Sequence, residues 1–330
     1  EEVGGADLPT TVMMAIQERL KSTVTPFIFP PDSPNLHMLL AAANEDQKAR
    51  YMEPYALGEI KSCIAISEPG AGGDPANMMT RAVKDGDEYV ITGQKIWTTG
   101  ADKADWIFCL VRTDPDAPKH EGITFILFPM DQPGVEVSPL NLIDGSADFS
   151  QVFFNEARAQ AKHVVGPVNG GWTIAKRLLQ HERSTDGGSE GGITGAMKDT
   201  ITDLVLREVG LQDGRLSDPA LRDRLAQQEM EARALKLTMR RAGEEARAGQ
   251  SGRDIGSLGK YRWANMVKAE QDLAMAAMGA QGLGWSGPGF SDVQLERTRA
   301  FLTTRSDSIW GGTNEVQLNV IAKRVLQIPE

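Results

Sequence analysis

The sequence predicts an α+β protein whose helices and strands occupy separate stretches of the chain. Three observations support this class. The first ~60 residues show helical periodicity, roughly the next hundred contain short β-type runs between turn signals, and the pattern after Gly170 is helical. No helix-length pattern separates the β-type runs, which favours an antiparallel sheet or a small barrel over parallel βαβ units.

The order of these patterns divides the chain into three expected parts. Residues 1–60 form an N-terminal helical segment, 61–165 a central antiparallel β domain and 166–330 a C-terminal helical bundle. The opening EEVGGADLPTT is typical of the middle of a domain, so we expect the N-terminal part to be truncated. Helical periodicity over 8–22 and 44–57 predicts a helix at each, with a proline-rich turn between them.

The central part alternates apolar runs with turn sequences. KDGD at 84–87 and DQPG at 131–134 are such turns. The strands expected between turns of this kind are 63–66, 89–92, 106–112, 123–129, 135–138 and 150–155.

The remainder of the chain carries helical periodicity almost without interruption. Asp218 followed by a proline makes a good helix start, and so does Thr313. The expected helices are 171–209, 218–249, 257–282, 290–304 and 313–327.

Composition excludes several classes of partner. At 330 residues, with 41% hydrophobic and 24% charged residues, the chain reads as an ordinary globular protein. Its net charge of -10 argues against nucleic acid and anionic membranes, and no apolar run is long enough for stable membrane insertion. Cys63 and Cys109 have no metal-ligand spacing, so we expect no metal site and a reducing, cytoplasmic setting.

One carboxylate lies where a helix should be apolar. In GWTIAKRLLQHER, residues 171–183, Trp172, Ala175, Leu178 and Leu179 share a stripe at helical spacing, and Glu182 falls in the middle of it. Two interpretations remain open at this point. Glu182 is either a structural partner of an arginine, which is the commoner case, or a functional base.

Two segments of the β part carry chemically useful residues. CIAISEPGAGGD at 63–74 contains glycines that allow a flat or charged ligand to approach the backbone, and GQKIWTTG at 93–100 contains an aromatic wall. The spacing matches neither a P-loop nor the dinucleotide fingerprint. The candidate ligand contacts are Ser67, Gly70, Gly72, Gly73, Trp97, Thr98 and Thr99.

Together these segments resemble signatures of the acyl-CoA dehydrogenase family. ISEPGAGGD at 66–74 is similar to the family's first signature and GQKIWTT at 93–99 to its second, while IWGGTNEVQ at 309–317 resembles its C-terminal motif. The resemblance covers nearly the whole chain. It implies an N-terminal helical domain, a central β domain and a C-terminal four-helix bundle, with FAD as the cofactor.

The resemblance also assigns candidate ligand contacts. Gly279, Gln281 and Gly282 correspond to a turn near the adenine of FAD. The other expected FAD contacts are Ile64, Ala65, Ile66, Ser67, Gly72, Gly73, Trp97, Thr98, Thr99, Thr313, Asn314 and Glu315. The expected substrate contacts are Gly73, Gln180, Arg183, Gly311 and Gly312.

The resemblance favours the functional interpretation of Glu182. Many family members carry the catalytic glutamate immediately before the Gly-Thr of the C-terminal motif, where this chain has Gly311. A minority, which includes isovaleryl- and long-chain-type enzymes, carry it on a bundle helix in a Leu-x-x-Glu-Arg context. Leu179 to Arg183 fits that context, so Glu182 is the expected base, with a structural pair to Arg183 as the alternative.

The implied activity is oxidation of an acyl-CoA to the trans-2-enoyl-CoA, with electrons passed to an electron-transferring flavoprotein. A homo-oligomer, as a dimer of dimers, is expected. Two departures from the family pattern are Gly73 in place of a serine and LQDGRLSD, at 211–218, in place of the Arg-x-x-Phe-Gly segment. The alternatives are an acyl-CoA-binding subunit of a hetero-oligomeric dehydrogenase, and an acyl-CoA oxidase or flavin monooxygenase.

Overall fold

The computed structural model describes Val12, Ile16 and residues 34–186, 199–248 and 255–329, without the side chains of residues 34, 35, 37, 180–186, 246 and 247. The chain forms two compact units. The first runs to Leu142 and again from Ser146 to His181, and the second contains Ile143–Gly145 and the chain from Glu182 onward. The three-part division at 1–60, 61–165 and 166–330 is finer than this and stays a prediction.

Two short helices precede the sheet in the first unit, α2 (Pro34–Ala42) and α3 (Glu45–Ala56). Asn44 begins α3 with a reciprocal capping box, because its side chain accepts from the backbone N–H of Gln47 at 2.9 Å and the Gln47 side chain accepts from that of Asn44 at 3.1 Å. The predicted helix at 44–57 is therefore confirmed. The helix expected at 8–22 lies outside the described residues apart from Val12 and Ile16.

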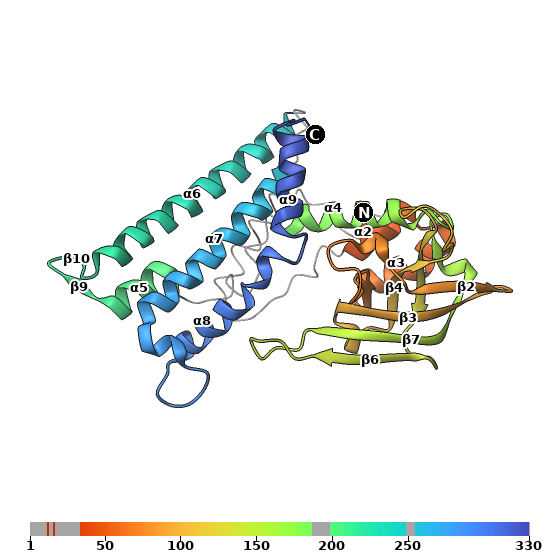
Figure 1. Ribbon diagram of the computed structural model, residues 1–330, viewed down its shortest axis with the longest axis horizontal. Coiled ribbons are helices and arrows are strands. Elements are labelled where there is room, and N and C mark those ends of the chain that lie inside the picture. Colours follow the sequence, from red (N-terminus) through yellow and green to blue (C-terminus); the bar gives the residue numbers. More distant parts are fainter. Residues whose placement is uncertain (1–11, 13–15, 17–33, 187–198, 249–254, 330) are drawn as a thin grey trace. The chain divides into compact units, whose positions relative to one another are not determined.

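A mixed, mainly antiparallel sheet forms the body of the first unit (Figure 1). Its strand order is β6-β7-β3-β2-β4-β5-β8, and β1 pairs with β4 in parallel. The strands are β1 (Ser62–Ala65), β2 (Arg81–Asp85), β3 (Glu88–Thr99), β4 (Trp106–Arg112), β5 (Ile123–Pro129), β6 (Val135–Leu140), β7 (Phe149–Gln160) and β8 (Val164–Val165). All six predicted strands are present, whereas β2 and β8 were not predicted.

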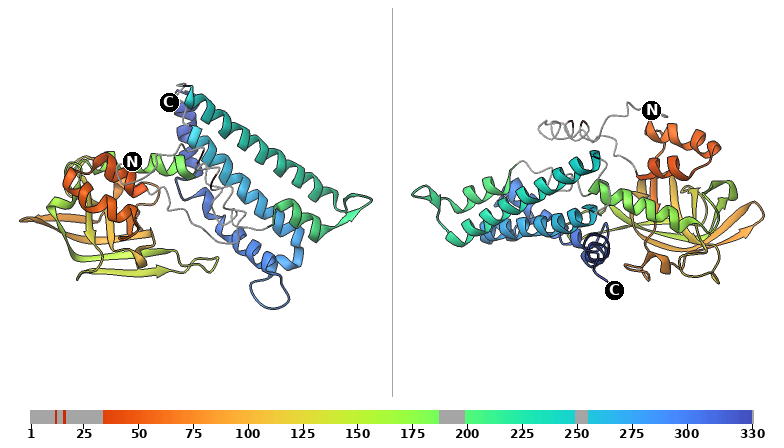
Figure 2. Two further views of the ribbon diagram at one scale, coloured as in Figure 1. Left: turned by 180° about the vertical axis from the view of Figure 1, so that it is seen from behind. Right: turned by 90° about the horizontal axis from the view of Figure 1, so that it is seen from above.

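Strands β4 and β5 are buried on both faces, which explains their nearly continuous apolar sequences. On one face Ile107 and Cys109 join a core with β3 and β7. On the other face Phe108 and Leu110 pack with side chains of α2, α3 and α4 (Gly171–Asp186), which lie on the same side of the sheet (Figure 2).

Helix α4 begins in tight contact with β5. A side chain at Gly171 would place its Cβ only 2.6 Å from the backbone nitrogen of Phe125, so glycine permits the approach. Just before the helix, the backbone N–H of Asn169 donates to Thr124 Oγ1 at 2.8 Å, and Thr113 Oγ1 donates to Asn169 Oδ1 at 2.5 Å. These contacts fix the start of α4 on the sheet.

The second unit is mainly helical in the part that the structure describes, and its strands β9 (Leu211–Gln212) and β10 (Arg215–Leu216) form a short antiparallel pair. Its helices are α5 (Ile201–Val209), α6 (Pro219–Arg247), α7 (Ile255–Met278), α8 (Asp292–Thr303) and α9 (Asn314–Val320), with a 3₁₀ turn at Gly279–Leu283 and a π turn at Ile321–Val325. The predicted starts at Asp218 and Thr313 are confirmed, because both side chains accept backbone N–H groups of the following helix. The single helix predicted over 171–209 is wrong. Thr200 has an extended backbone (φ -67°, ψ 162°) and caps a new helix.

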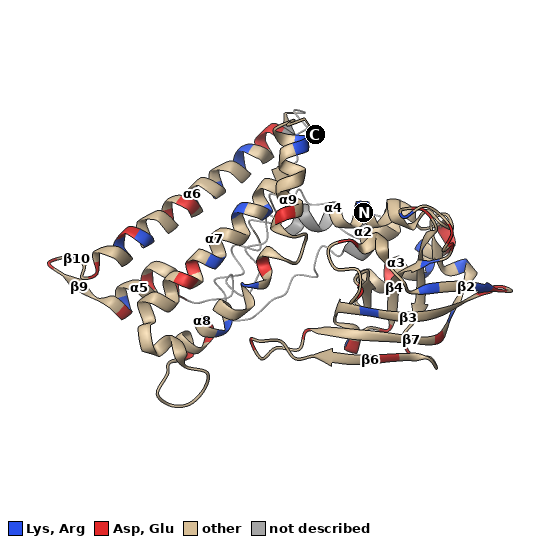
Figure 3. Ribbon diagram, in the orientation of Figure 1, with Lys and Arg blue, Asp and Glu red and all other residues tan. Residues whose placement is uncertain are grey.

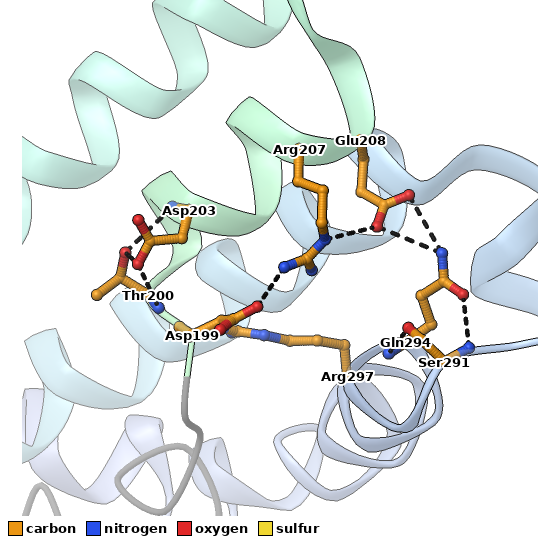
Figure 4. A network of polar contacts seen from close by, with 8 residues as sticks. All are labelled: Asp199, Thr200, Asp203, Arg207, Glu208, Ser291, Gln294 and Arg297. Carbon is orange, nitrogen blue, oxygen red and sulfur yellow. Dashed lines mark hydrogen bonds and ion pairs between the residues drawn. The ribbon is translucent and has the colours of Figure 1, made fainter. Parts of the chain in front are cut away.

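A buried arginine links three of these helices. Arg297 on α8 donates to the Glu270 carboxylate on α7 at 2.8 Å and to the Asp199 carbonyl before α5 at 2.6 Å. A second link joins Gln294 of α8 to Glu208 of α5 at 3.2 Å (Figure 4). Charge-assisted bonds of this kind are stronger than bonds between neutral groups.

Acidic and basic residues are interleaved along α6 (Figure 3). Arg240 pairs with Glu244 at 2.9 Å and Arg241 with Glu245 at 2.7 Å, both at i,i+4 spacing. Among the helices that the structure describes, none is long and apolar enough to cross a membrane.

His163 is buried where α3 meets the sheet. Its ring lies 5.5 Å from that of Trp106 and 5.9 Å from that of Tyr51, and neither ring nitrogen has a hydrogen-bond partner among the described residues. Burial, together with the positive charges of Arg50 and Lys162, lowers the pKa of His163 from 6.5 to about 4. Protonation of the ring therefore opposes folding.

We expect this histidine to make the protein acid-sensitive. Because the folded pKa lies below the unfolded one, stability is unaffected above pH 6.5 and falls as the pH drops from 6.5 towards 4. The full loss is about 3 kcal/mol. The free energy of unfolding, measured with denaturant across this pH range, should decrease less with falling pH in His163→Phe than in the wild type. His120→Gln, at an exposed position, should keep the wild-type pH dependence. Identical slopes for His163→Phe and the wild type would contradict the assignment.

Candidate functional site

The two β-part signatures meet at the end of β1 and the end of β3. The backbone N–H of Ile96 donates to the Ser67 carbonyl at 3.0 Å, which joins the two segments directly. Immediately beyond, Trp97 has a left-handed backbone (φ 61°) and its side chain is 54% exposed. The indole of Trp97 offers a flat apolar surface to a ligand, and exposed Thr99, two residues further along, offers a hydroxyl.

The glycine-rich loop after Ser67 is open. A Cβ added at Gly70, Gly72 or Gly73 would meet nothing within 4 Å, so the backbone there is free to receive a ligand. The loop, the indole and the hydroxyls together fit a flat, polar-edged cofactor such as FAD.

Two of the predicted cofactor residues contribute no side chain to this surface. Ala65 and Thr98 are fully buried, so a contact from either would fall to its backbone. Ile64, Ile66 and Ser67 are half-buried, and the side chains of Ile64 and Ile66 pack against the core that β4 and β5 share with α2, α3 and α4.

The C-terminal motif forms a separate, well-supported turn in the second unit. Gly311 (φ 61°) and Gly312 (φ 91°) both have left-handed backbones. The buried Gln317 side chain donates to the Gly311 carbonyl at 3.2 Å and to that of Gly312 at 3.4 Å. Thr313 then caps α9 by accepting from the Val316 N–H at 3.3 Å.

The remaining predicted cofactor residues of this unit differ in exposure. Asn314 is tied to α7, because its amide donates to Asn265 Oδ1 at 3.2 Å, whereas Glu315 is exposed. In the 3₁₀ turn, Gly279 and Gln281 are exposed and Gly282 is buried, with its carbonyl accepting from Thr298 Oγ1 at 3.2 Å.

Sequence analysis missed Asp307, which lies beneath the C-terminal motif. Burial raises the pKa of its carboxyl to about 6, although Lys260 and a hydrogen bond from the Trp310 side chain oppose the shift. Lys260, itself buried, donates to the Asp307 carbonyl. Asp307 therefore supports the turn that leads into Gly311. Nothing in the local sequence distinguishes it from a surface aspartate.

Glu182, Gln180 and Arg183 lie within α4, but their side chains are outside the described residues. The predicted stripe is confirmed in part, because Ala175 and Leu178 are buried whereas Trp172 and Leu179 are half-buried. The position of the Glu182 side chain on this stripe stays a prediction.

A groove of about 360 Å³ lies between α6 and α7. Its lining includes the ion pair of Arg262 with Glu231. None of the predicted site residues lines it, so we do not assign the site to it.

Two domain models of one protein family match the chain. Residues 63–157 match the acyl-CoA dehydrogenase middle domain, and residues 169–326 match the acyl-CoA dehydrogenase C-terminal domain. The chain belongs to the acyl-CoA dehydrogenase family, and it is an oxidoreductase of that class.

Individual relatives and solved structures are similar over the full length of the chain. The chain is 35% identical over 337 residues to acyl-CoA dehydrogenase IpdE1 of Mycobacterium tuberculosis, and the alignment covers 100% of this chain and 83% of that protein. It is similar in structure to the Tcur3481-Tcur3483 steroid ACAD, with a TM-score of 0.86 and 30% identity, covering 100% of this chain and 84% of that one. It also resembles the ChsE4-ChsE5 complex from Mycobacterium tuberculosis, with a TM-score of 0.82 and 27% identity over 100% of this chain and 85% of that one.

Proposed function

We propose that the protein is an FAD-dependent acyl-CoA dehydrogenase that converts an acyl-CoA to the trans-2-enoyl-CoA and passes electrons to an electron-transferring flavoprotein. The observation that carries the proposal is the combination of Gly311, in a left-handed turn without a side chain, with a glutamate at 182 on α4. The family membership of the chain and the open surface around Trp97 support it.

The proposal assigns separate roles to the catalytic base and to the residues that bind the flavin. Glu182 removes the α-proton of the thioester, which is a weak acid and therefore requires a positioned base in a water-poor site. Ser67, Trp97 and Thr99 would hold the flavin on the surface of the β part, and Thr313 stays a predicted FAD contact of the second unit. FAD, when bound, accepts the hydride from the β-carbon.

Spectroscopy of the purified chain tests this function. We expect about one FAD per subunit, and bleaching of the flavin when a suitable acyl-CoA is added without oxygen. The substrate screen should contain CoA thioesters of steroid-derived acids beside straight and branched chains, because one similar structure is described as a steroid ACAD. A colourless protein that takes up no added FAD would contradict the proposal. Oxygen consumption without an artificial acceptor would favour the oxidase or monooxygenase alternative.

A second proposal concerns assembly. We infer that the chain works together with a different acyl-CoA dehydrogenase chain, because two of the similar structures are named for pairs of proteins. The competing prediction is a homo-oligomeric dimer of dimers. Sedimentation and activity of the chain alone separate them: an active homotetramer supports the second, and activity that appears only with an added partner chain supports the first.

A further inference from the structure

Two charged residues of the signature segments are buried without a role in the proposed contacts. Lys95 on β3 is 0% exposed and Glu68, just after β1, is 7% exposed. Lys95 Nζ lies 2.8 Å from Glu68 Oε1. Lysine is almost never fully buried, and a buried ion pair costs much of its attraction in lost hydration. Stability alone is therefore a weak explanation for this pair.

The pair joins three segments of chain. The Glu68 carboxylate accepts from the backbone N–H of Met79 at 2.6 Å and of Thr80 at 3.0 Å, just before β2. Lys95 Nζ also donates to the carbonyl of Ile66 at 3.2 Å. The exit of β1, the entrance of β2 and the middle of β3 are thus held by two side chains.

Both charges are maintained in this position. Burial pushes the pKa of the Glu68 carboxyl upward, but Lys95 and the hydrogen bonds from Thr80 and Met79 outweigh burial and hold it below its usual value. An ionised carboxylate accepts more strongly than a neutral one, so the three segments are held by charge-assisted bonds.

The residues next to the pair are those that the proposed function assigns to the flavin. Ser67 directly precedes Glu68, and Trp97 follows Lys95 by two residues. The Lys95 bond to the Ile66 carbonyl and the Ile96 bond to the Ser67 carbonyl lie side by side between the two segments. Any shift of the pair therefore changes the separation of Ser67 and Trp97.

We propose that Glu68 and Lys95 are positioning residues for the flavin, which hold the Ser67 and Trp97 segments at the separation that binds it. This inference rests on the proposed function. Disruption of the pair should therefore lower the affinity for FAD in addition to any loss of folding stability.

Three variants separate positioning from folding. Lys95→Met leaves a buried carboxylate without its cation, and we expect a large loss of stability. Glu68→Gln with Lys95→Met removes both charges but keeps one amide oxygen, which can accept from either the Met79 or the Thr80 N–H group, so stability should recover only in part. The link to the Ile66 carbonyl stays broken in that double variant. Arg158→Gln, which removes an exposed ion pair with Asp85 on the same sheet, is the control.

The measurements are denaturant unfolding without FAD, titration of FAD into the apoprotein by flavin fluorescence, and the visible circular dichroism of the bound flavin. We expect the folded double variant to bind FAD about 10-fold or more weakly, with an altered dichroism band, and the Arg158→Gln control to match the wild type. Wild-type affinity and dichroism in the double variant would overturn this inference alone. A wild-type chain that binds no FAD would overturn the proposed function as well.

Discussion

Glu182→Gln is expected to keep FAD and to bind acyl-CoA, but to lose dehydrogenation by about 10³-fold or more. Glutamine preserves the size of the side chain and its helix propensity but cannot take up the α-proton. A positioned general base contributes roughly 10²–10⁴-fold, and the loss of the negative charge from the pocket adds to the effect. The measurement is the rate of flavin bleaching by acyl-CoA in a rapid-mixing experiment.

The matched control is Glu244→Gln on the exposed face of α6, which makes the same chemical change in a surface ion pair. It should bleach at the wild-type rate. Near-normal bleaching by Glu182→Gln would return Glu182 to the role of a structural partner of an arginine. It would also remove the main support for the proposed mechanism.

Moving the carboxylate should restore part of the activity. We expect Glu182→Gly with Gly311→Glu to bleach the flavin at least about 10-fold faster than Glu182→Gly alone, because the second change puts a base where many family members carry it. Recovery should be incomplete for two reasons. Glycine inside α4 costs about 1 kcal/mol, and a side chain at 311, where φ is 61°, costs about 1–2 kcal/mol.

Gly311→Ala in the Glu182→Gly background carries the same backbone strain without a carboxylate. It should therefore remain inactive. Equal rates for the alanine and glutamate versions would show that position 311 does not face the reacting carbon. A change in the preferred acyl chain length should accompany any recovery, since the new side chain adds volume at position 311.

Local patterns were sufficient for most of the fold. Strands β4 and β5 are uninterrupted apolar runs between turns, and α6 begins at an Asp-Pro pair, so each could be recognised from neighbouring residues alone. Strand β2 was not predicted because only Ala82 of RAVKD is buried, so the sequence shows no alternation of apolar and polar residues. The break before α5 was missed although Gly187, Gly188, Gly191 and Gly192 precede it in the sequence, and the extended backbone of Thr200 shows where a new helix starts.

The site was predictable as motifs but not as an arrangement. Ser67 and Trp97 stand out as residue types that suit a ligand, whereas Glu68 and Lys95 look like ordinary surface charges. Their burial depends on a pairing between residues 27 positions apart, and no local signal reports it. The same is true of Asp307, whose environment is built by α7 and by the turn that follows it.

Helix α4 is held at its start, where Gly171 makes a close contact with β5. Glu182 is eleven residues further along the helix, which places it about 16 Å from that contact for a rise of 1.5 Å per residue. A tilt of only about 4° displaces the far end by roughly 1 Å, and a misplacement of that size can cost about 10²-fold in rate. The angular tolerance for the proposed base is therefore set at the other end of the helix, where Thr113, Thr124 and Asn169 fix its start on the sheet.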